Sequence, residues 1–371
     1  MPAKSSTRSA GKAPAEPGRR VTMTDVATQA AVSQSTVSLV LNGMTGTKLS
    51  DETRARVLRV AAELGYRLPD RRAAAPVRRG AARSAAASPL VLYLVDEIST
   101  SPHPVLSIDG AKDEAWTQGA LVAVFATRSN AGIESAVLSA MLANPGLAGV
   151  IYSTIFTREI TVPPPLLRVP TVLLNCHEPE KTRSGGEPRF SSVEPSEVLG
   201  GFAATESLLE AGHRRIAFIN GEPWMDAARD RLKGYRRALA TADIAYDASL
   251  VREGDWQVAS GHEHTLSLMK QPRPPGAIFC ANDLMAVGCL EALRQLGRRV
   301  PQDVSVIGYD DQEIARHTSP PLSTLVLPNY EMGRLAAEML LAQIAAPDGR
   351  RRRVKVDGRL VPRGTVAAPA R

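Results

Sequence analysis

The sequence has few aromatic residues, few cysteines and no long apolar run. Phe, Trp and Tyr make up 4% of the 371 residues, and three residues are cysteine. No apolar stretch approaches the roughly 20 residues that cross a bilayer. The first 20 residues contain no apolar core of a signal peptide. We therefore expect a cytoplasmic protein rather than a secreted or membrane-spanning one.

The cysteines and histidines are too widely spaced to suggest a metal site. Cys176, Cys280 and Cys289 lie in or beside apolar segments and away from any CxxC spacing, which favours buried structural thiols. His262 and His264, the closest pair of histidines, are two residues apart in a predicted helix, so their rings diverge. We expect no metal and no cofactor.

The motifs of common α/β enzymes are also missing. The sequence has no GxSxG nucleophile elbow, no phosphate-binding loop and no GxGxxG that opens a helix after a strand. Asp310 and Asp311 are adjacent at the end of a predicted strand, so their carboxyl groups point apart. We therefore expect no catalytic residues and no enzymatic activity.

What the sequence has in excess is positive charge. Lysine and arginine number 45 against 38 acidic residues, a formal charge of +7, which fits a polyanionic partner. One arginine cluster, between residues 71 and 83, directly follows a compact helical segment, as contacts to DNA phosphates would. The second cluster, residues 350–353, more simply flanks a terminal strand on a solvated surface.

Changes in composition divide the chain into four parts. Residues 1–20 are rich in Ala, Ser, Pro and Arg, which predicts a disordered arm. A compact helical unit over residues 21–68 is followed by an Ala-, Arg- and Pro-rich linker over residues 69–88. Residues 89–366 alternate short apolar runs with helical stretches.

The apolar runs of the large domain are short, rich in β-forming residues and nearly continuous. Such runs are typical of strands buried on both faces of a parallel sheet, and helical segments lie between them. Because about 280 residues exceed one compact core, we predict an α/β fold of two doubly wound subdomains with a cleft between them. The predicted strands cover residues 90–95, 121–126, 148–153, 171–175, 215–220, 277–281 and 304–310. The predicted helices include residues 133–142, 196–211, 229–240 and 283–296.

The unit over residues 21–68 contains three predicted helices. A capping box at Thr22 opens the first, and Ser33 caps the second, which ends near residue 42. Ser50 caps the third, which Gly65 ends. The turn between the first two helices is only AVS. This all-α arrangement is typical of a DNA-binding helix-turn-helix, although an ordinary helical hairpin has similar caps.

The strings TMTDVATQAAVSQSTVSLVLNG and SDETRARVLRVAAELGYR resemble the DNA-binding headpiece of the LacI/GalR family of repressors. From Leu90 to about Pro362, strings such as GHRRIAFI, AIFCANDLMAVG and VSVIGYDD are similar to the periplasmic-binding-protein-like core of these repressors. The resemblance implies a sequence-specific regulator of transcription, and a repressor before an activator. A small polar effector would control its affinity for operator DNA. A solute-binding protein, the alternative with the same core, has no headpiece.

The resemblance also implies how the headpiece contacts DNA. Gln34, Ser35 and Leu39 occupy the base-reading positions of the recognition helix. Leu39 stands where the family often has Arg, and it offers only apolar contact, for instance to a thymine methyl group. Contacts to phosphates, or support of the recognition helix, are implied for Thr22, Ser33, Thr36, Ser38 and Asn42.

After the headpiece, the family has a short hinge helix that inserts a Leu into the minor groove. Here Pro76 stands at or next to the Leu position. Proline cannot continue a helix, which argues against a hinge helix in this chain. Arg71 and Arg72 would still anchor the linker to phosphates.

Five residues are expected to bind the effector. Asn175, Asn282 and Asp310 each end a predicted strand, where a cleft side chain belongs, although each alone would more simply cap the next helix. The resemblance assigns these three, with Arg231 and Trp256, to the effector pocket. Arg231 and Asp310 would bind hydroxyl groups, and Trp256 would pack on a ring. We therefore expect the effector to be a sugar or related polyol, with a purine-like corepressor as the alternative.

The expected assembly is a homodimer on a pseudo-palindromic operator. One headpiece contacts too few bases for specificity, and two-fold protein symmetry requires two-fold DNA sites. The tail from Ala345 lacks leucine heptads, so we expect no coiled-coil tetramer. Such a protein would be cytoplasmic and associated with the nucleoid.

Overall fold

The computed structural model divides the chain into two compact units, residues 1–73 and 74–371. The predicted arm, the linker before Ser88 with Arg71, Arg72 and Pro76, and the site residues Thr22 and Asn42 lie outside the described residues. Of Thr24 and Ser35 only the backbone is described. The structure describes residues 21, 23–41, 49–66, 88–179, 188–347 and 349–369.

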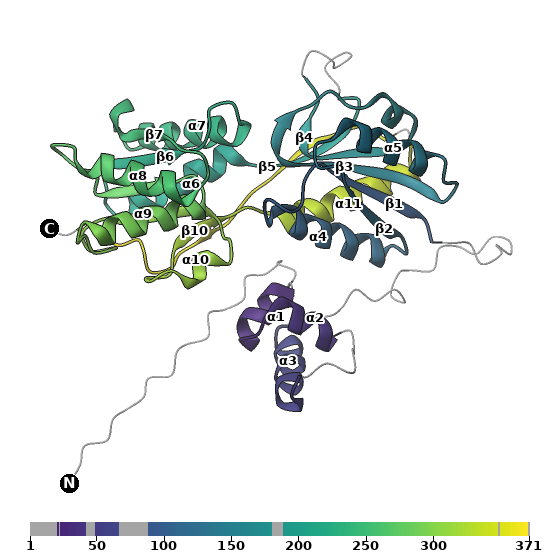
Figure 1. Ribbon diagram of the computed structural model, residues 1–371, viewed down its shortest axis with the longest axis horizontal. Helices are drawn as coiled ribbons and strands as arrows, with labels where there is room; N and C mark the ends of the chain where they lie inside the picture. The colour runs from purple at the N-terminus through teal and green to yellow at the C-terminus, as the bar shows by residue number, and fades with distance from the viewer. Residues whose placement is uncertain are drawn as a thin grey trace, which may run out of the picture. The chain divides into compact units, whose positions relative to one another are not determined.

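The described residues of the smaller unit form a bundle of three short helices (Figure 1). They are α1 (Met23–Ala30), α2 (Gln34–Leu41) and α3 (Asp51–Glu63). Apolar residues at helical spacing bury one face of each helix, as the sequence predicts. The buried core consists of Val26, Ala27, Ala30, Val37, Val40, Val57, Val60 and Ala61.

Two of the predicted helix caps are confirmed. The hydroxyl oxygen of Ser33 accepts a hydrogen bond from the backbone N–H of Thr36 at 3.1 Å, and so caps α2. The hydroxyl oxygen of Ser50 does the same for the N–H of Thr53 at 3.2 Å and caps α3. Gly65 has φ +69°, a left-handed conformation that favours glycine and ends α3 where the sequence predicts.

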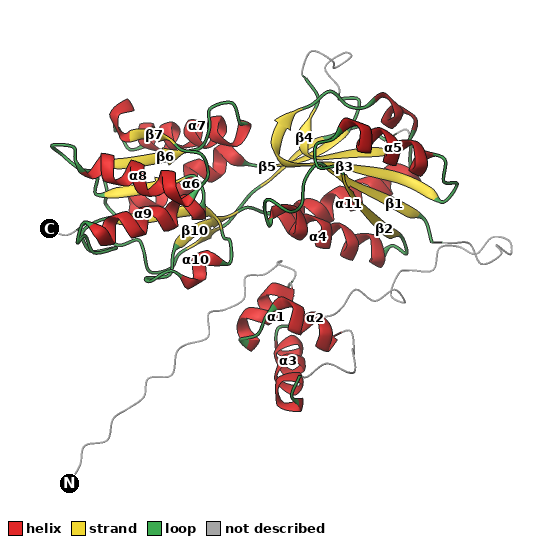
Figure 2. Cartoon of the chain, viewed as in Figure 1, coloured by secondary structure: helices red, strands yellow, loops and turns green. Residues whose placement is uncertain are grey.

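In the larger unit, the residues that the structure describes form two six-stranded sheets, each with helices packed against it (Figure 2). The first sheet has β1 (Leu90–Val95), β2 (Leu121–Ala126), β3 (Leu147–Glu159), β4 (Thr171–His177), β5 (Ser191–Pro195) and β11 (Arg353–Val356). The second has β6 (Ile216–Asn220), β7 (Val251–Glu253), β8 (Ala277–Cys280), β9 (Ser305–Asp310), β10 (Ser323–Val326) and β12 (Leu360–Val361).

The strand orders are β11-β5-β4-β3-β1-β2 and β12-β10-β9-β8-β6-β7. All neighbouring strands run parallel except β10 and β12. The chain passes between the sheets after β5, after β10 and after β11, so both subdomains are built from segments far apart in the sequence. The predicted pair of doubly wound subdomains is confirmed.

Helices cover both faces of the first sheet. Alternate residues of β1 pack with α4 and α11 on one side and with α5 on the other, because successive strand side chains point to opposite faces. The helices of this subdomain are α4 (His103–Thr117), α5 (Ala131–Leu142), α11 (Asn329–Ala345) and the 3-10 turn η1 (Pro164–Arg168). The second subdomain has α6 (Glu197–Glu210), α7 (Asp226–Thr241), α8 (Val258–Met269), α9 (Asp283–Gln295), α10 (Ile314–His317) and the 3-10 turn η3 (Ala248–Leu250).

One strand differs from the expected burial. The apolar run of residues 121–126 forms β2, but Leu121 is 45% and Phe125 41% exposed. The prediction that this run is buried on both faces is wrong, because β2 is the edge strand and pairs only with β1. The edge leaves an apolar surface accessible to another molecule.

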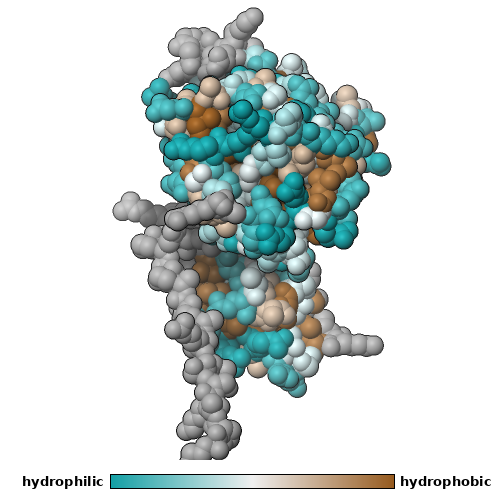
Figure 3. Space-filling view, turned by 90° about the vertical axis from the view of Figure 1, so that its left-hand side faces the viewer, coloured by the Kyte–Doolittle hydropathy of each residue, from teal (hydrophilic) through white to brown (hydrophobic). Residues whose placement is uncertain are grey.

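The surface and the cysteines agree with a globular protein. On the face seen in Figure 3, apolar side chains form patches interrupted by polar ones. In the part of the chain that the structure describes, no helix is both long and apolar enough to cross a membrane. Cys176, Cys280 and Cys289 are buried and form no disulfide, as expected of structural thiols. The rings of His262 and His264 diverge, since they contact Gln295 and the carbonyl of Glu253 respectively.

Candidate functional site

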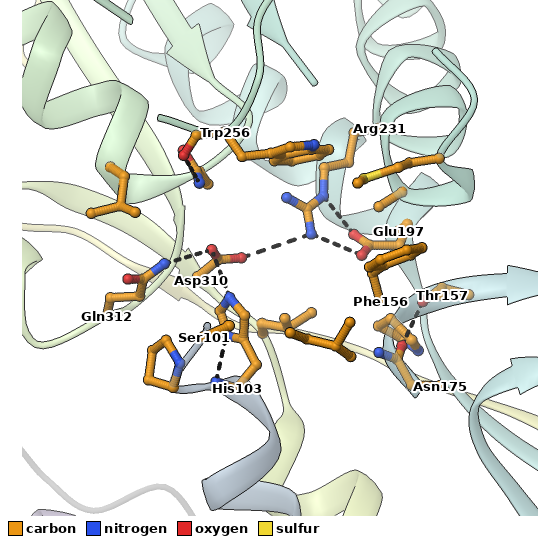
Figure 4. A pocket seen from close by; sticks show the side chains of 18 of the residues that line it. Ser101, His103, Phe156, Thr157, Asn175, Glu197, Arg231, Trp256, Asp310 and Gln312 are labelled. Atoms are coloured by element: carbon orange, nitrogen blue, oxygen red, sulfur yellow. Dashed lines mark hydrogen bonds and ion pairs between the residues drawn. The ribbon is translucent and has the colours of Figure 1, made fainter. Parts of the chain in front are cut away.

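A cavity of about 410 Å³ lies between the two sheets, at the carboxyl ends of their strands (Figure 4). Its volume is within the range of small-molecule sites. Both subdomains contribute to its wall. The five residues that the sequence points to, Asn175, Arg231, Trp256, Asn282 and Asp310, all line this cavity.

Arg231 is held by a carboxylate that the sequence analysis did not single out. Its Nε and Nη2 donate to the two carboxylate oxygens of Glu197 at 2.7 and 2.8 Å, and Nη1 donates to the carbonyl of Ala281. The guanidinium carbon lies 3.6 Å from the centre of the Tyr309 ring. Burial, the largest single effect, lowers the pKa of Arg231, but Glu197, Tyr309 and Asp310 together outweigh it and the pKa is raised. The charge of Arg231 is therefore balanced within the protein.

Asp310 connects the two sides of the cavity. It ends β9 with φ +107°, and its Oδ2 accepts a hydrogen bond from Gln312 Nε2 at 3.1 Å. The same oxygen lies 3.4 Å from Nε2 of His103, which begins α4 in the other subdomain (Figure 4). Oδ1 lies 3.8 Å from Nη2 of Arg231. A ligand hydroxyl near Asp310 would thus meet groups from both subdomains.

Asp311 turns away from this cavity, as expected for the residue next to Asp310. Its carboxylate is paired with Arg316 and Arg363 and does not line the wall. The two neighbouring carboxylates therefore have separate roles, one in the cavity and one in holding the C-terminal segment.

The two asparagines are already hydrogen-bonded within the protein. The side-chain oxygen of Asn175 accepts from the hydroxyl of Thr157 at 2.6 Å, and its amide donates to a carbonyl of β3. Asn282 caps α9 by accepting from the N–H of Met285 at 2.8 Å, and its amide donates to the carbonyl of Trp256 at 2.9 Å. The capping alternative is therefore confirmed for Asn282, which also lines the cavity. Each amide keeps one N–H and one lone pair for a ligand.

Trp256 is positioned by packing. Its indole lies against Gly221, where a Cβ atom would be 1.9 Å from the ring carbon Cζ2, so only glycine fits there. The Arg231 guanidinium lies 5.7 Å from the ring centre. The indole N–H is buried and has no acceptor among the residues that the structure describes. Contact rather than hydrogen bonding holds this ring in the wall.

Sequence reasoning missed His103, Phe156, Glu197 and Gln312, all of which line the cavity. None belongs to a motif, and His103 and Phe156 come from the first subdomain, far in the sequence from Asp310 and Arg231. Glu197 lies at the start of a predicted helix, but acidic residues are common in a first turn because they interact favourably with the helix dipole, so its position did not indicate a pocket.

The candidate DNA-reading face belongs to α2 and the turn before it. Gln34, Ser38 and Leu39 are partly exposed, since the buried residues of α2 face the core of the small unit. Ser33 caps the helix, and its hydroxyl lies 2.9 Å from that of Thr36. The backbone at the end of α1 is further held by Arg56, whose Nε donates to the carbonyl of residue 30 at 3.1 Å.

Comparison with known proteins identifies both units. Residues 22–68 match the model of bacterial regulatory proteins of the lacI family, and residues 205–366 match a periplasmic binding protein-like domain. The HTH-type transcriptional regulator CelR of Thermobifida fusca is 36% identical over 337 residues, which cover 88% of this chain and 92% of CelR. The ribose operon repressor of Haemophilus influenzae is 32% identical over 329 residues, covering 88% and 93% of the two chains.

Solved structures of regulators have the same fold. A complex of the transcriptional regulator CelR with cellobiose has a TM-score of 0.63 and 30% identity, covering 94% of this chain and all of that one. The lac repressor dimer bound to operator and an anti-inducer has a TM-score of 0.63, 29% identity and the same coverage. These relatives are regulators of transcription and not enzymes. The chain therefore belongs to the LacI family and is a DNA-binding regulator of transcription.

Proposed function

We propose that this regulator is a repressor whose affinity for operator DNA is controlled by a sugar, or a sugar derivative, bound between the two sheets. The observation that carries the proposal is the cavity, where a carboxylate, two amides and an indole surround about 410 Å³. Carboxylates and amides bind hydroxyl groups, and an aromatic face packs on the C–H face of a sugar ring. Relatives named for a ribose operon and bound to cellobiose support this ligand class.

Control of DNA binding would arise because the bound ligand contacts both subdomains. Phe156 and His103 line the cavity from the first subdomain, and Asp310 and Trp256 line it from the second. A ligand that contacts both sides favours one relative arrangement of the subdomains. Such coupling is typically about 1–3 kcal/mol between two sites. Transmission to the headpiece passes through residues 69–88, where Pro76 argues against a hinge helix.

We further infer a homodimer that binds a pseudo-palindromic operator in the cytoplasm, at the nucleoid. The similarity to the lac repressor dimer bound to operator supports this, and the exposed apolar side chains of Leu121 and Phe125 on β2 offer a surface for a second copy. Base contacts are assigned to Gln34, Ser35 and Leu39. Phosphate contacts are assigned to Thr22, Ser33, Thr36, Ser38, Asn42, Arg71 and Arg72.

The test is a titration of operator binding with candidate effectors. An operator is first selected from random duplex DNA with the full-length protein, and its Kd is then measured with ribose, cellobiose or hypoxanthine. We expect a sugar to shift the Kd by about 5- to 150-fold. Asp310→Ala should remove the shift and leave the ligand-free Kd within about twofold, because this residue is not in the headpiece.

The control is Asp303→Ala, which removes a partly exposed carboxylate that pairs with Arg299 in the same subdomain and does not line the cavity. This variant should respond like the parent protein. A shift with hypoxanthine and with no sugar would show that the ligand is purine-like and would refute the proposed class. An Asp310→Ala variant that responds like the parent would refute the location of the site.

A further inference from the structure

Two aromatic side chains meet at the edge of the cavity. Phe156, which lines the cavity from β3, contacts the indole of Trp224 edge to face, with ring centres 5.3 Å apart and planes at 79°. Trp224 precedes α7 and belongs to the second subdomain, so the pair links both subdomains. Glu222 and Met225, on either side of Trp224 in the sequence, line the cavity. Trp224 itself is not among the lining residues, so it lies beside the cavity wall, next to Phe156.

Trp224 is unusually accessible for its size. It is 57% exposed, whereas Trp256 inside the cavity is half-buried. One face of Phe156 is covered by the guanidinium of Arg158, 4.9 Å from the ring centre, and Arg158 in turn pairs with Asp96 at 2.9 Å. The contact with a fixed Phe156 orients the indole, which keeps an open apolar surface in water. Large apolar side chains exposed beside a cavity mark binding surfaces.

The cavity is larger than one sugar ring requires. At about 410 Å³ it lies in the size range of pockets that bury drug-sized ligands, which have more atoms than one hexose. Trp256 and Asp310 line the cavity from the second subdomain, and Phe156 lines it from the first (Figure 4). A ring beside Trp256 leaves room for a second ring that extends toward Trp224.

The charges in the wall favour an uncharged ligand. Among the described residues that line the cavity, Arg231 is the only arginine or lysine. Its guanidinium already donates two hydrogen bonds to the carboxylate of Glu197. Three further carboxylates, those of Glu222, Asp255 and Asp310, also face this space. A phosphate or carboxylate needs unpaired cationic donors, and this wall offers carboxylates instead.

We propose that the effector is an uncharged saccharide of at least two rings. One ring lies beside Trp256 and Asp310, and the next packs its C–H face on Trp224 beside the cavity wall. The π-face of an indole carries partial negative charge and attracts the weakly positive C–H groups of a sugar ring. This inference rests on the proposed function of the same cavity as a sugar site and specifies the length and charge of the sugar.

The experiment is calorimetric titration of the full-length protein with glucose, cellobiose, maltose and glucose 6-phosphate. We expect at least one disaccharide to bind at least tenfold more tightly than glucose, and glucose 6-phosphate not to bind. Trp224→Ala should weaken the binding of the disaccharide by about 2- to 10-fold, the range of one aromatic contact, and leave the binding of glucose unchanged. Because Trp224 is mostly exposed, its removal creates no buried cavity that would unfold the chain.

Trp116→Ala is the matched control, since it removes another partly exposed indole, on α4 and outside the cavity wall. It should bind the disaccharide like the parent. Glucose binding as tight as that of both disaccharides, or an unchanged disaccharide affinity in Trp224→Ala, would overturn the two-ring inference and leave the sugar site in place. Binding of none of the neutral sugars would overturn both the inference and the proposed function.

Discussion

Removal of Arg231 alone is expected to destabilise the larger unit, because it leaves the carboxylate of Glu197 buried without its cation. Both residues are 3% exposed, and two hydrogen bonds of 2.7 and 2.8 Å join them. The guanidinium also stacks on Tyr309, so truncation removes packing as well as charge. For this reason Asp310→Ala, rather than Arg231→Ala, is the informative variant for the effector response.

The expected magnitude follows from the burial of the pair. Truncation of one partner of a buried ion pair costs about 3–5 kcal/mol, whereas replacement of both partners by apolar residues is often neutral. Arg231→Ala should therefore lower the free energy of unfolding by about 3–5 kcal/mol, a large part of the 5–15 kcal/mol typical of native domains. The double variant Arg231→Met with Glu197→Leu should regain most of that loss.

The assay is urea unfolding of the full-length protein, followed by tryptophan fluorescence, since Trp256 lies 5.7 Å from the Arg231 guanidinium. Parent, Arg231→Met, Glu197→Leu and the double variant form a double-mutant cycle that isolates the interaction. The control is Arg294→Ala, which breaks an exposed pair with Glu291 and should cost at most about 1 kcal/mol. A loss below about 1 kcal/mol in Arg231→Ala, or a double variant no more stable than the single ones, would refute the reasoning.

Three other outcomes follow. Gln34→Ala should change base preference, whereas Arg71→Ala should weaken binding to all sequences and reduce the slope of log K against log salt by about one. Measuring the binding of both variants to a panel of operator variants over a range of salt concentrations distinguishes the two effects. A changed base preference with an unchanged salt slope in Arg71→Ala would contradict the linker assignment. Gly221→Ala places a methyl group where Cζ2 of Trp256 lies and so displaces the indole, and calorimetry should show effector binding weakened by about tenfold. Burial lowers the pKa of His213 from its usual 6.5, so the unfolded chain takes up the proton first and stability falls as pH drops below that value. His213→Gln should therefore lose less stability than the parent between about pH 7.5 and pH 5.5 in urea unfolding, and equal losses would exclude this role.

Much of the fold could be predicted because its local causes lie within short segments. A strand buried in a parallel sheet needs a nearly continuous apolar run, and all seven such runs form strands. The caps at Ser33 and Ser50 also depend only on neighbouring residues. Strands β5, β7, β10, β11 and β12 are short or polar, so they lack that pattern. The exposure of β2 depends on its place in the strand order, which no local pattern contains.

The residues of the candidate site likewise include some that could be predicted from the sequence and some that could not. Asn175 and Asp310 could be placed at the cavity from the sequence because the carboxyl ends of parallel strands meet at one edge of a sheet. The residues that pair with Arg231 and Asp310 could not be predicted. Glu197 is 34 positions from Arg231, and His103 lies in the other subdomain from Asp310. No spacing rule predicts these pairs, because the first depends on how α6 packs against α7 and the second on how the two sheets face each other.

The sequence by itself indicated three short helices and two doubly wound subdomains, because helix caps and apolar runs act over a few residues. The resemblance to the LacI/GalR family supplied the DNA-binding role and the five residues of the cleft. Only the tertiary structure decided that Glu197 balances Arg231, that Asp310 lies near His103 and that Phe156 and Trp224 meet beside the cavity. The first of these contacts joins α6 to α7 within one subdomain, and the other two join elements of different subdomains. Their geometry arises from packing over the whole unit and not from any local segment.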